Sequence, residues 1–238
     1  MNAFIYGVIL QWKLDFRNKG ILLTYYVVPL VFFAFMGGIF SSINPESKDT
    51  LIQSMTIFGV TMGAVLGSPT PLTELYGSEI KKAYKVGHIP LYVPVINNYI
   101  SATIHLLLMS VVIYFVAPIA FNASIPENVL LYFLALILFI ITSVAVGTLL
   151  GLLVKSVSRL TMISQVIFLP SLMLSGIMFP SEMLPQPLEI VGKALPATLG
   201  FQLMNSQDFS SLNGWLLLII TLILWVISTW RLFKLRVS

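Results

Sequence analysis

The side chains that could do acid–base or metal chemistry are few in this chain, and they lie far apart. With no cysteine among 238 residues, the chain has no thiolate nucleophile, no disulfide and no cysteine-based metal site. Its two histidines, His88 and His105, are seventeen residues apart and are expected at different depths, so they make a poor metal pair. Motifs of the Gly-x-Ser-x-Gly and His-Glu-x-x-His types are absent. We therefore predict no catalytic site and no metal site.

Nucleotide binding is excluded by a similar argument. A phosphate-binding loop needs Gly-x-x-x-x-Gly-Lys followed by Ser or Thr, because backbone N–H groups and the lysine together hold the phosphates. The only Gly-Lys step in the sequence is Gly192-Lys193, which is not part of such a motif. This chain should therefore not bind ATP productively.

The elements that must position any functional side chain are six long apolar runs without Asp, Glu, Lys or Arg: 21–40, 51–73, 91–116, 129–154, 162–179 and 212–230. Each run is long enough, at about 1.5 Å per residue, to cross or nearly cross a hydrocarbon core of roughly 30 Å. The composition, 58% hydrophobic and 9% charged, is too apolar for a soluble domain. We predict an all-α membrane protein whose residues 1–238 form a single transmembrane domain.

The basic residues are distributed unequally between the gaps that separate these runs. Only Lys48 and Lys193 fall on one side of the expected membrane. The other eleven fall on the opposite side: Lys13, Arg17, Lys19, Lys81, Lys82, Lys85, Lys155, Arg159, Arg231, Lys234 and Arg236. Because basic loops stay in the cytoplasm, both termini should be cytoplasmic. The net charge of +4 is then a signal of topology and does not indicate a nucleic-acid partner.

Residues 1–20 differ from the six runs. Apolar side chains recur there at intervals of three and four residues, at Phe4 or Ile5, Val8 or Ile9, Trp12 and Phe16. This pattern is typical of an amphipathic helix that lies in the membrane interface. It favours a lipid-anchoring role, with a docking surface for a cytoplasmic partner as the functional alternative.

The second run contains a stripe of small residues, Gly59, Gly63 and Gly67. Glycines spaced by four allow another helix to approach closely, either within the chain or at a dimer or pathway interface. We expect Pro69 and Pro71, at the end of this run, to kink or stop the helix. Five apolar residues, Met55, Phe58, Met62, Phe168 and Met173, are candidates for lining a pathway for an amphipathic cargo, and ordinary packing or lipid contact is the alternative.

The loop 74–90 is the most informative hydrophilic stretch. It predicts a short amphipathic helix, with apolar and aromatic residues on one side and lysines on another, suited to contact with a protein partner. The alternative is a solvated basic loop, which would explain the lysines but not Tyr76 and Tyr84. The candidate contact residues are Glu74, Gly77, Glu79, Ile80, Lys81, Tyr84 and Lys85.

Prolines divide the region 180–211 into apolar pieces that are too short to cross a membrane. We predict short re-entrant helices before the sixth span, with an ordinary interfacial loop as the alternative. Glu189 and Lys193 are four apart and could pair on one helix face. The candidate residues for an outer gate, Ser175, Gly176, Phe179 and Pro180, lie at the end of the fifth run and the start of this region.

Two of these segments resemble a known family. The stretch Leu174-Ser-Gly-Ile-Met-Phe-Pro180, followed by Met183-Leu-Pro185 and Leu195-Pro196, resembles the fifth span and outer loop of ABC-2 type export permeases. Glu74-x-x-Gly77 with Pro90 is similar to the first cytoplasmic loop of that family, although Leu75 stands where an arginine often follows the glutamate. The resemblance extends over the whole chain.

The resemblance implies an N-terminal interfacial helix, six transmembrane helices and a multi-pass protein of the bacterial plasma membrane. It also implies a second permease subunit, in a homo- or heterodimer, and two cytoplasmic ATPase subunits that bind ATP and Mg²⁺. The helix near residues 78–86 would sit in a cleft of the ATPase, with Glu74 helping to fix it.

The expected function is therefore export of a drug, a peptide antibiotic or a lipid-like molecule. The alternatives are export of a polysaccharide or lipid-linked glycan, and a stand-alone secondary transporter. A secondary transporter would use ionisable residues within the membrane, and the six runs offer only His105 for this purpose. A single membrane histidine favours a hydrogen bond between helices over a proton relay.

Overall fold

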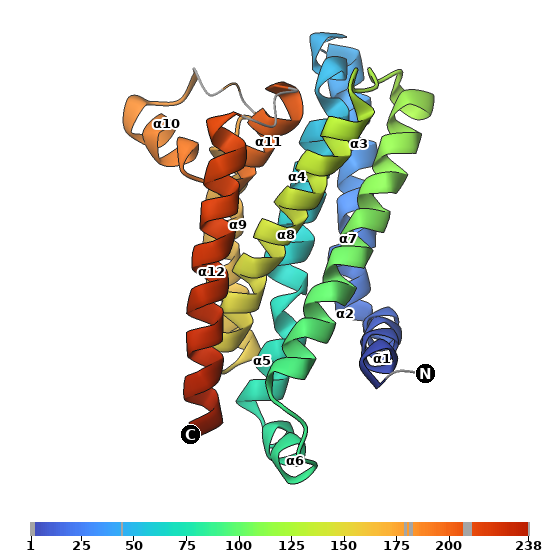
Figure 1. Cartoon of the computed structure of the whole chain (residues 1–238). Coiled ribbons are helices and arrows are strands. Elements are labelled where there is room, and N and C mark those ends of the chain that lie inside the picture. Colours follow the sequence, from blue (N-terminus) through green and yellow to red (C-terminus); the bar gives the residue numbers. More distant parts are fainter. Residues whose placement is uncertain (1–2, 44, 179, 181–182, 207–210, 238) are drawn as a thin grey trace.

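The computed structural model describes residues 3–43, 45–178, 180, 183–206 and 211–237. Throughout this part of the chain the regular secondary structure is helical, and no strand is formed. The prediction of an all-α protein is confirmed. The hydrophobic runs of the sequence lie side by side as a bundle of long helices (Figure 1).

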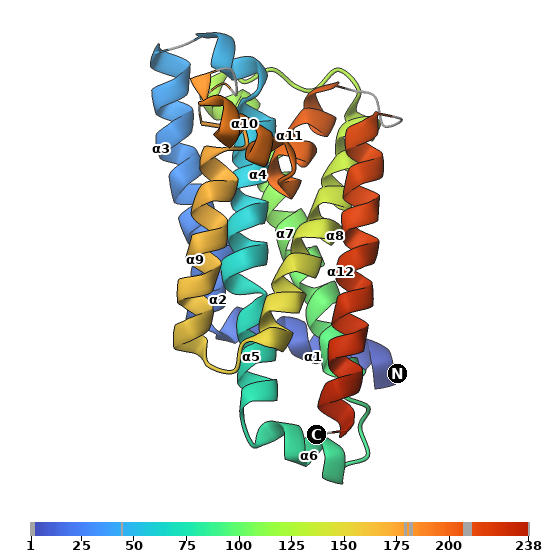
Figure 2. The ribbon, with the colours of Figure 1, turned by 90° about the vertical axis from the view of Figure 1, so that its left-hand side faces the viewer.

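The first long segment is preceded by a separate helix. Helix α1 (Ala3–Arg17) lies across one end of the bundle, roughly perpendicular to the long helices (Figure 2). The chain then turns at Asn18, whose side chain accepts hydrogen bonds from two backbone N–H groups of α2 (Lys19–Leu22). A π-helical segment, η1 (Leu23–Val27), joins α2 to α3 (Val28–Ile43). This cap explains why α1 and the first span change direction at Asn18.

The second long segment consists of α4 (Leu51–Met62), the π-helical η3 (Gly63–Gly67) and α5 (Pro69–Gly77), and a 3₁₀ turn, η2 (Pro45–Asp49), precedes it. Helical structure continues to Gly77, so of the two expected effects of the prolines, a kink or a stop, the stop is wrong. Pro69 is the first residue of α5, where its missing N–H is tolerated, and the N–H of Ser68 reaches back to the Gly63 carbonyl at 2.9 Å. The wider π turn accommodates the prolines without ending the helix.

A short helix, α6 (Ile80–Val86), follows, and then α7 (Tyr92–Phe121) and α8 (Val129–Leu153). The predicted run 129–154 agrees closely with α8, but α7 continues five residues beyond the end at 116 that was predicted for it. It ends at Asn122, which adopts the left-handed conformation at φ 52° and terminates the helix.

Helix α9 (Val157–Met173) begins before the predicted run 162–179 and ends six residues earlier than expected. The chain leaves the helix just before Gly176, whose positive φ of 85° is incompatible with a continuing right-handed helix. Two short helices, α10 (Gln186–Lys193) and α11 (Pro196–Ser206), precede the last helix, α12 (Leu212–Val237). Phe179 lies outside the described residues.

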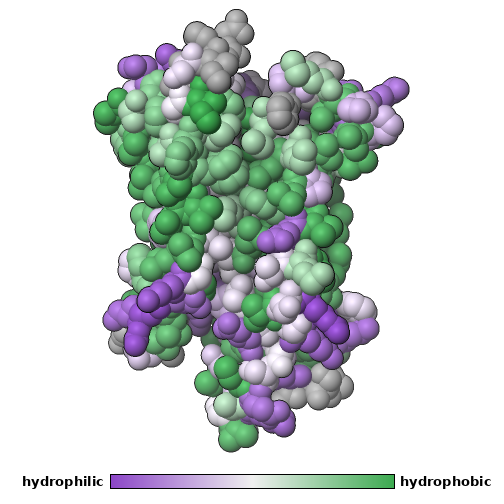
Figure 3. Space-filling model, turned by 180° about the vertical axis from the view of Figure 1, so that it is seen from behind, coloured by the Kyte–Doolittle hydropathy of each residue, from purple (hydrophilic) through white to green (hydrophobic). Residues whose placement is uncertain are grey.

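The two ends of the bundle differ. Helix α6, helix α1 and the C-terminus lie at one end, and α10 and α11 lie at the other (Figures 1 and 2). Seen from behind, an apolar surface covers the middle of the molecule, and hydrophilic residues gather toward the α6 end (Figure 3). This arrangement is that of a protein whose middle is surrounded by lipid.

Within the described residues, five helical stretches are long and apolar enough to cross a membrane: Lys19–Phe40, Leu51–Gly77, Tyr92–Phe121, Val129–Leu153 and Leu212–Leu235. The predicted fifth crossing, α9, is apolar but has only 17 residues. At about 1.5 Å per residue it spans roughly 25 Å, slightly less than the hydrocarbon core. Helix α9 runs alongside the other long helices in Figure 2.

Candidate functional site

The base of α6 is attached firmly to the bundle. The hydroxyl of Tyr76, near the end of α5, donates a hydrogen bond to the carbonyl oxygen of Leu91, immediately before α7. The ring of Tyr76 also packs on a small apolar cluster made by Leu72, Val95, Leu152 and Leu235. At Gly77 the backbone passes so close to the loop between α8 and α9 that an added Cβ would overlap the Lys155 carbonyl. The connection to α6 therefore starts and ends on fixed points.

Helix α6 itself protrudes beyond the bundle (Figure 1). Its apolar residues are unusually open, with Ile80 51% and Val86 80% exposed. Glu79 and Lys82 form an ion pair at 2.5 Å, but both side chains are exposed, so the pair contributes little stability. Exposed apolar residues on a helix with a fixed base are suited to binding another protein.

The predicted coupling residues are all found around this helix. Glu74 and Gly77 are exposed at the end of α5, and Ile80 is exposed at the start of α6. Lys81 and Tyr84 are partly buried, and the backbone carbonyl of Tyr84 accepts a hydrogen bond from the N–H of Ile89 at 2.9 Å. The side chain of Lys85 lies outside the described part of the structure. The segment thus combines exposed apolar and charged groups in one small volume.

The three glycines of α4 and η3 are covered by side chains of the same chain. Added Cβ atoms would overlap Met109 at Gly59, Leu106 at Gly63, and Thr24 and Tyr25 at Gly67. Met109 and Leu106 belong to α7, and Thr24 and Tyr25 belong to η1. The glycine stripe therefore lets the first and third long segments pack closely against the second.

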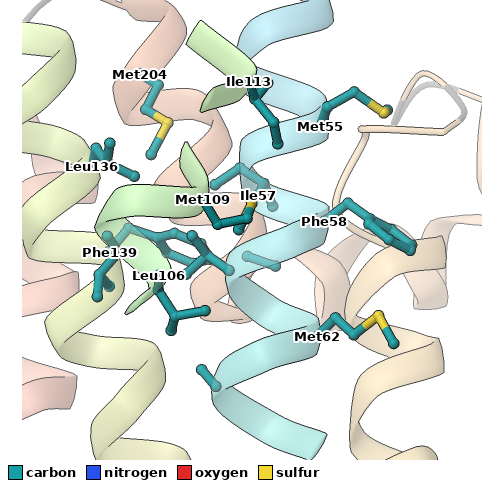
Figure 4. Close-up of a cluster of buried hydrophobic side chains, with 14 of the residues drawn as sticks. Met55, Ile57, Phe58, Met62, Leu106, Met109, Ile113, Leu136, Phe139 and Met204 are labelled. Atoms are coloured by element: carbon teal, nitrogen blue, oxygen red, sulfur yellow. The ribbon is translucent and has the colours of Figure 1, made fainter. Parts of the chain in front are cut away.

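The candidate pathway residues of α4 lie on a different side of that helix. In Figure 4, Met55, Phe58 and Met62 extend away from Met109, Leu136 and Phe139. The ring of Phe58 stacks on Phe32 at a centroid distance of 3.8 Å and meets Phe168 of α9 edge-on at 5.9 Å. These side chains form a closed apolar seam between α4, α3 and α9.

One candidate pathway residue is separate from this seam. Met173, the last residue of α9, is 55% exposed, whereas Met55, Phe58, Met62 and Phe168 are all buried. The structure therefore joins Phe58 to Phe168 and leaves Met173 on the surface.

The segment that follows α9 is held beneath the two short helices. Ser175 is buried, and its hydroxyl donates to the Leu172 carbonyl at 2.8 Å. The hydroxyl of Thr198, in α11, donates to the Leu174 carbonyl at 3.4 Å. Gly176 supplies the positive φ that this turn requires, and Pro180 is exposed. Two of the candidate gate residues therefore form a tight turn at this end of the bundle.

Helix α11 enters the end of the bundle, whereas α10 stays at its surface. An added Cβ at Gly200 of α11 would lie 2.5 Å from the ring of Phe139 in α8. On α10, Ile190 is 62% exposed, and Glu189 pairs with Lys193 at 2.7 Å, as predicted. The close packing of α11 makes it a structural part of the bundle end.

A buried polar cluster at the α1–α7 contact was not anticipated. Asp15 of α1 is only 1% exposed, and Ser101 and His105 of α7 are fully buried beside it. The Ser101 hydroxyl donates to Asp15 Oδ2 at 2.6 Å, and the Gln11 amide donates to Oδ1 at 2.8 Å. Burial raises the pKa of the Asp15 carboxyl, and the hydrogen bonds from Ser101 and Gln11 oppose that rise.

His105 also contacts the first long segment. Its Nδ1 atom lies 2.7 Å from the hydroxyl of Tyr26 in η1, which is the kind of hydrogen bond between helices that the sequence favoured. Its Nε2 atom lies 3.8 Å from Asp15 Oδ2, too far for a hydrogen bond but close enough for electrostatic attraction when the ring is charged. A signal for this cluster existed in the sequence: Gln11 and Asp15 are four apart, as are Ser101 and His105.

A cavity of about 720 Å³ lies away from the α4–α9 seam. It is located where the loop before α7 meets the end of α12, and its walls include His88, Tyr92 and Phe233. A smaller apolar cavity of about 120 Å³ adjoins it between α7, α8 and α12. Neither cavity includes a predicted pathway residue.

A bundle of membrane-length apolar helices, with a fixed helical projection at one end and a short inserted helix at the other, defines a multi-pass membrane protein. The sequence profile of the ABC-2 type transporter family matches residues 3–209, and the chain belongs to this family. The chain is also similar to a Bacillus subtilis (strain 168) protein named "Putative transport permease YvfS". The two are 24% identical over 204 residues, which cover 83% of this chain and 82% of that protein. The family predicted from the sequence is confirmed, and with it the role of a transport permease.

Proposed function

We propose that this chain is the membrane subunit of an ATP-driven exporter. A separate cytoplasmic subunit would bind and hydrolyse ATP, and two copies of it would serve a pair of permease chains. The observation that carries this proposal is α6, which presents exposed apolar residues on a base fixed by Tyr76 and Gly77. A rigidly based helix can transmit the movement of a docked partner into the bundle, whereas a flexible loop cannot.

The orientation follows from the same end of the molecule. Helix α6, helix α1 and the C-terminus lie together, and this end contains most of the basic residues (Figure 1). Because basic segments stay on the cytoplasmic side, this end would face the cytoplasm and meet the ATPase. In this arrangement α9 is the fifth of six crossings, completed by the turn that follows Met173, α12 is the sixth, and α10 and α11 dip into the outer leaflet.

The second permease subunit would bind along α9. The glycine stripe of the second segment is already covered by α7 and η1. Helix α9, by contrast, directs a row of large apolar side chains outward, including Met162, Val166 and Leu169. A partner along this row would lie beside the seam formed by Phe58 and Phe168, so that cargo could pass between the two subunits. Pairing with an identical chain or with a related one is compatible with this surface.

The cargo is proposed to be hydrophobic or amphipathic, such as a drug, a peptide antibiotic or a lipid-like molecule. The seam between α4 and α9 is apolar and contains Met55 and Met62, whose flexible side chains adapt to irregular shapes. A polysaccharide or a lipid-linked glycan is the alternative, because such a cargo also starts at the inner leaflet.

The docking proposal is tested by co-purification from cells that express the permease and its ATPase. Ile80→Asp places a charge on the exposed face of α6 and should reduce recovery of the ATPase at least about tenfold, as expected for a hot-spot contact worth 1.4 kcal/mol or more. Ile125→Asp is the matched control, because Ile125 is 54% exposed in a loop at the opposite end. Equal recovery with both variants would contradict docking on α6.

A secondary transporter remains a second candidate because of one observation. Proton-driven carriers need ionisable groups within the protein, and the structure adds the buried Asp15 to His105. Liposomes that contain only this chain should then accumulate a lipophilic fluorescent cation under a proton gradient. The exporter proposal expects no accumulation without the ATPase and ATP.

A further inference from the structure

Asp15 has no part in the docking surface, yet it is one of the most deeply buried charged residues described. It lies on α1, whose exposed apolar residues, such as Ile5 and Leu14, could anchor the helix to the membrane interface without it. A buried carboxylate is unfavourable unless hydrogen bonds replace its water, and a solvated position would avoid that cost. Its location between α1 and α7 therefore requires an explanation beyond lipid anchoring.

The contacts of Asp15 fix the position of α1 along α7. Both carboxylate oxygens are occupied, one by the Ser101 hydroxyl at 2.6 Å and the other by Gln11 at 2.8 Å. Close by, Gly7 passes so near Asn97 that an added Cβ would lie 2.5 Å from its amide nitrogen. Apolar surfaces can slide against each other, but a buried hydrogen-bonded group is satisfied in only one register.

His105 extends this contact to the first and second long segments. In the tautomer that suits both neighbours, the Tyr26 hydroxyl donates to Nδ1 and Nε2–H points toward Asp15. The imidazole also stacks on Trp12 at a centroid distance of 5.7 Å and lies 5.2 Å from the ring of Tyr25. Tyr25 in turn covers Gly63 and Gly67. One imidazole therefore touches α1 and η1 directly, and reaches η3 through a single ring.

The two segments that meet at Tyr25 are both π-helical, η1 and η3. Such turns replace regular helical hydrogen bonds with a wider loop and occur often where a helix has a functional role. Here they contact each other through Tyr25 of η1, which packs against Gly63 and Gly67 of η3 and lies beside the ring of His105. The cluster is thus located where the long helices are least regular.

The same cluster is connected to α6 through α7. The loop after α6 returns to Leu91, which Tyr76 holds in place, and α7 begins at the next residue. Ser101 and His105 lie about three turns further along this continuous helix. A displacement of α6 would therefore reach Asp15 through a single rigid element.

We propose that Asp15 and His105 form a latch that makes α1 move together with α7 when the ATPase displaces α6. They are positioning residues for transport, because they act through α7 and touch neither nucleotide nor cargo. The inference rests on the proposed function, since α6 must be the site that receives the movement. It adds that the interfacial helix is a moving part of the transport cycle.

The test uses the complete permease–ATPase complex in liposomes. Since the chain has no cysteine, Leu10→Cys on α1 and Leu108→Cys on α7 give two unique sites for spin labels, and both residues are partly exposed. Electron–electron resonance measures the distance between them, with and without the non-hydrolysable nucleotide adenylyl imidodiphosphate. The measurement is repeated with Asp15→Asn, His105→Phe and the milder Ser101→Ala.

We expect the same distance distribution with and without nucleotide when Asp15 and His105 are intact. With Asp15→Asn or His105→Phe the distance should match the parent in the absence of nucleotide. On nucleotide addition it should shift or broaden by about 5 Å, the length of one helical turn, because α1 no longer follows α7. Ser101→Ala should show a smaller change in the same direction. Leu14→Ala, on the lipid-facing side of α1, is the control and should behave as the parent.

Three results would overturn the latch. The distance in the parent could change with nucleotide, the variants could remain identical to the parent in both states, or the variants could lose the parent distance before nucleotide is added. The last result would mean that Asp15 only holds α1 in its resting position and has no role in coupled movement. Failure of the proposed function is seen separately, because the ATPase would then not co-purify even with the unsubstituted chain.

Discussion

The apolar runs of the second and the last long segments, 51–73 and 212–230, both lack charged residues, yet the two segments occupy opposite environments. In Leu51–Gly77, 94% of the most apolar stretch is buried within the protein, compared with 17% in Leu212–Leu235. The second segment carries glycines where α7 and η1 approach, and the last directs large side chains such as Leu222 and Val226 outward. Hydropathy identifies a crossing helix, but the size of its side chains decides whether it can occupy the centre.

This difference matters for function because the central segment is the one that continues into α6. A displacement of α6 would be transmitted first to this central, most deeply buried segment. From there it would reach α3, α7, α8 and α9, which all contact that segment. Helix α12 has contacts mainly with α8 and α11 and otherwise faces lipid. The account therefore expects substitutions to have large effects in the second segment and small effects in the last.

The largest effect is expected from truncating a central side chain. Ile57 of α4 is fully buried, so Ile57→Ala should lower the free energy of unfolding by about 2–5 kcal/mol, since it leaves a cavity. Leu222→Ala on α12, where the side chain is 65% exposed, should change it by less than about 0.5 kcal/mol. Thermal unfolding in detergent measures both. Similar losses would mean that the two segments do not differ in packing.

Replacing glycine by alanine should change the free energy of unfolding in opposite directions at two positions, one beside the central segment and one on α3. A Cβ at Gly147 of α8 would overlap the Ala64 carbonyl of the central segment, so Gly147→Ala should destabilise the protein by about 1–3 kcal/mol. At Gly38 of α3 a Cβ would have no atom within 4 Å. Gly38→Ala should therefore stabilise by about 0.5–1 kcal/mol through helix propensity. Opposite shifts of the melting temperature are the expected result, and shifts of equal sign would contradict it.

A hydrogen bond between helices should give a smaller difference. The hydroxyl of Thr56 in the central segment lies 3.0 Å from that of Tyr132 in α8. Thr56→Val leaves the Tyr132 hydroxyl without this partner and should cost about 0.6–1.7 kcal/mol. On α12, Thr229 donates to the carbonyl of Val226 in its own helix and is exposed, so Thr229→Val should have almost no effect. Chemical unfolding of the two variants provides the measurement.

The smallest effect concerns pH and the cluster at α1. The pKa of Asp15 is raised in the folded protein, so folding is favoured when this group is protonated. Its contribution is complete below the pKa of the unfolded chain and is lost as pH rises through the folded value. The melting temperature should therefore fall slightly more from pH 4 to pH 8 in the parent than in Asp15→Asn. The nearby titratable groups Tyr25, Tyr26 and His105 are the same in both proteins.

Much of the fold could be predicted from the sequence because lipid imposes a simple rule. An uncharged run of about 20 residues must satisfy its own backbone, so five runs appear as membrane-length helices close to their expected positions. The ends were harder to predict, because they depend on local geometry. The π turn before Pro69 allowed the second segment to continue to Gly77, and the turn at Gly176 ended α9 early.

The candidate site was only partly predictable for a related reason. The amphipathic pattern around Ile80 indicated α6, because the alternation of apolar and charged residues is visible in the sequence itself. Asp15 was grouped with the charged residues beside the membrane, since no property of a single residue shows that a distant Ser101 and His105 will surround it. Contacts between α1 and α7 depend on the tertiary fold and become visible only there.

The central claim is that α6 faces the cytoplasm, where an ATPase can reach it. Because the chain has no cysteine, a single substitution Val86→Cys on α6 can be labelled with a membrane-impermeant maleimide in intact cells. The account predicts no labelling until the cells are made permeable, while Ile125→Cys at the opposite end is labelled at once. Labelling of Val86→Cys in intact cells would contradict the orientation, the docking surface and the proposed export mechanism together.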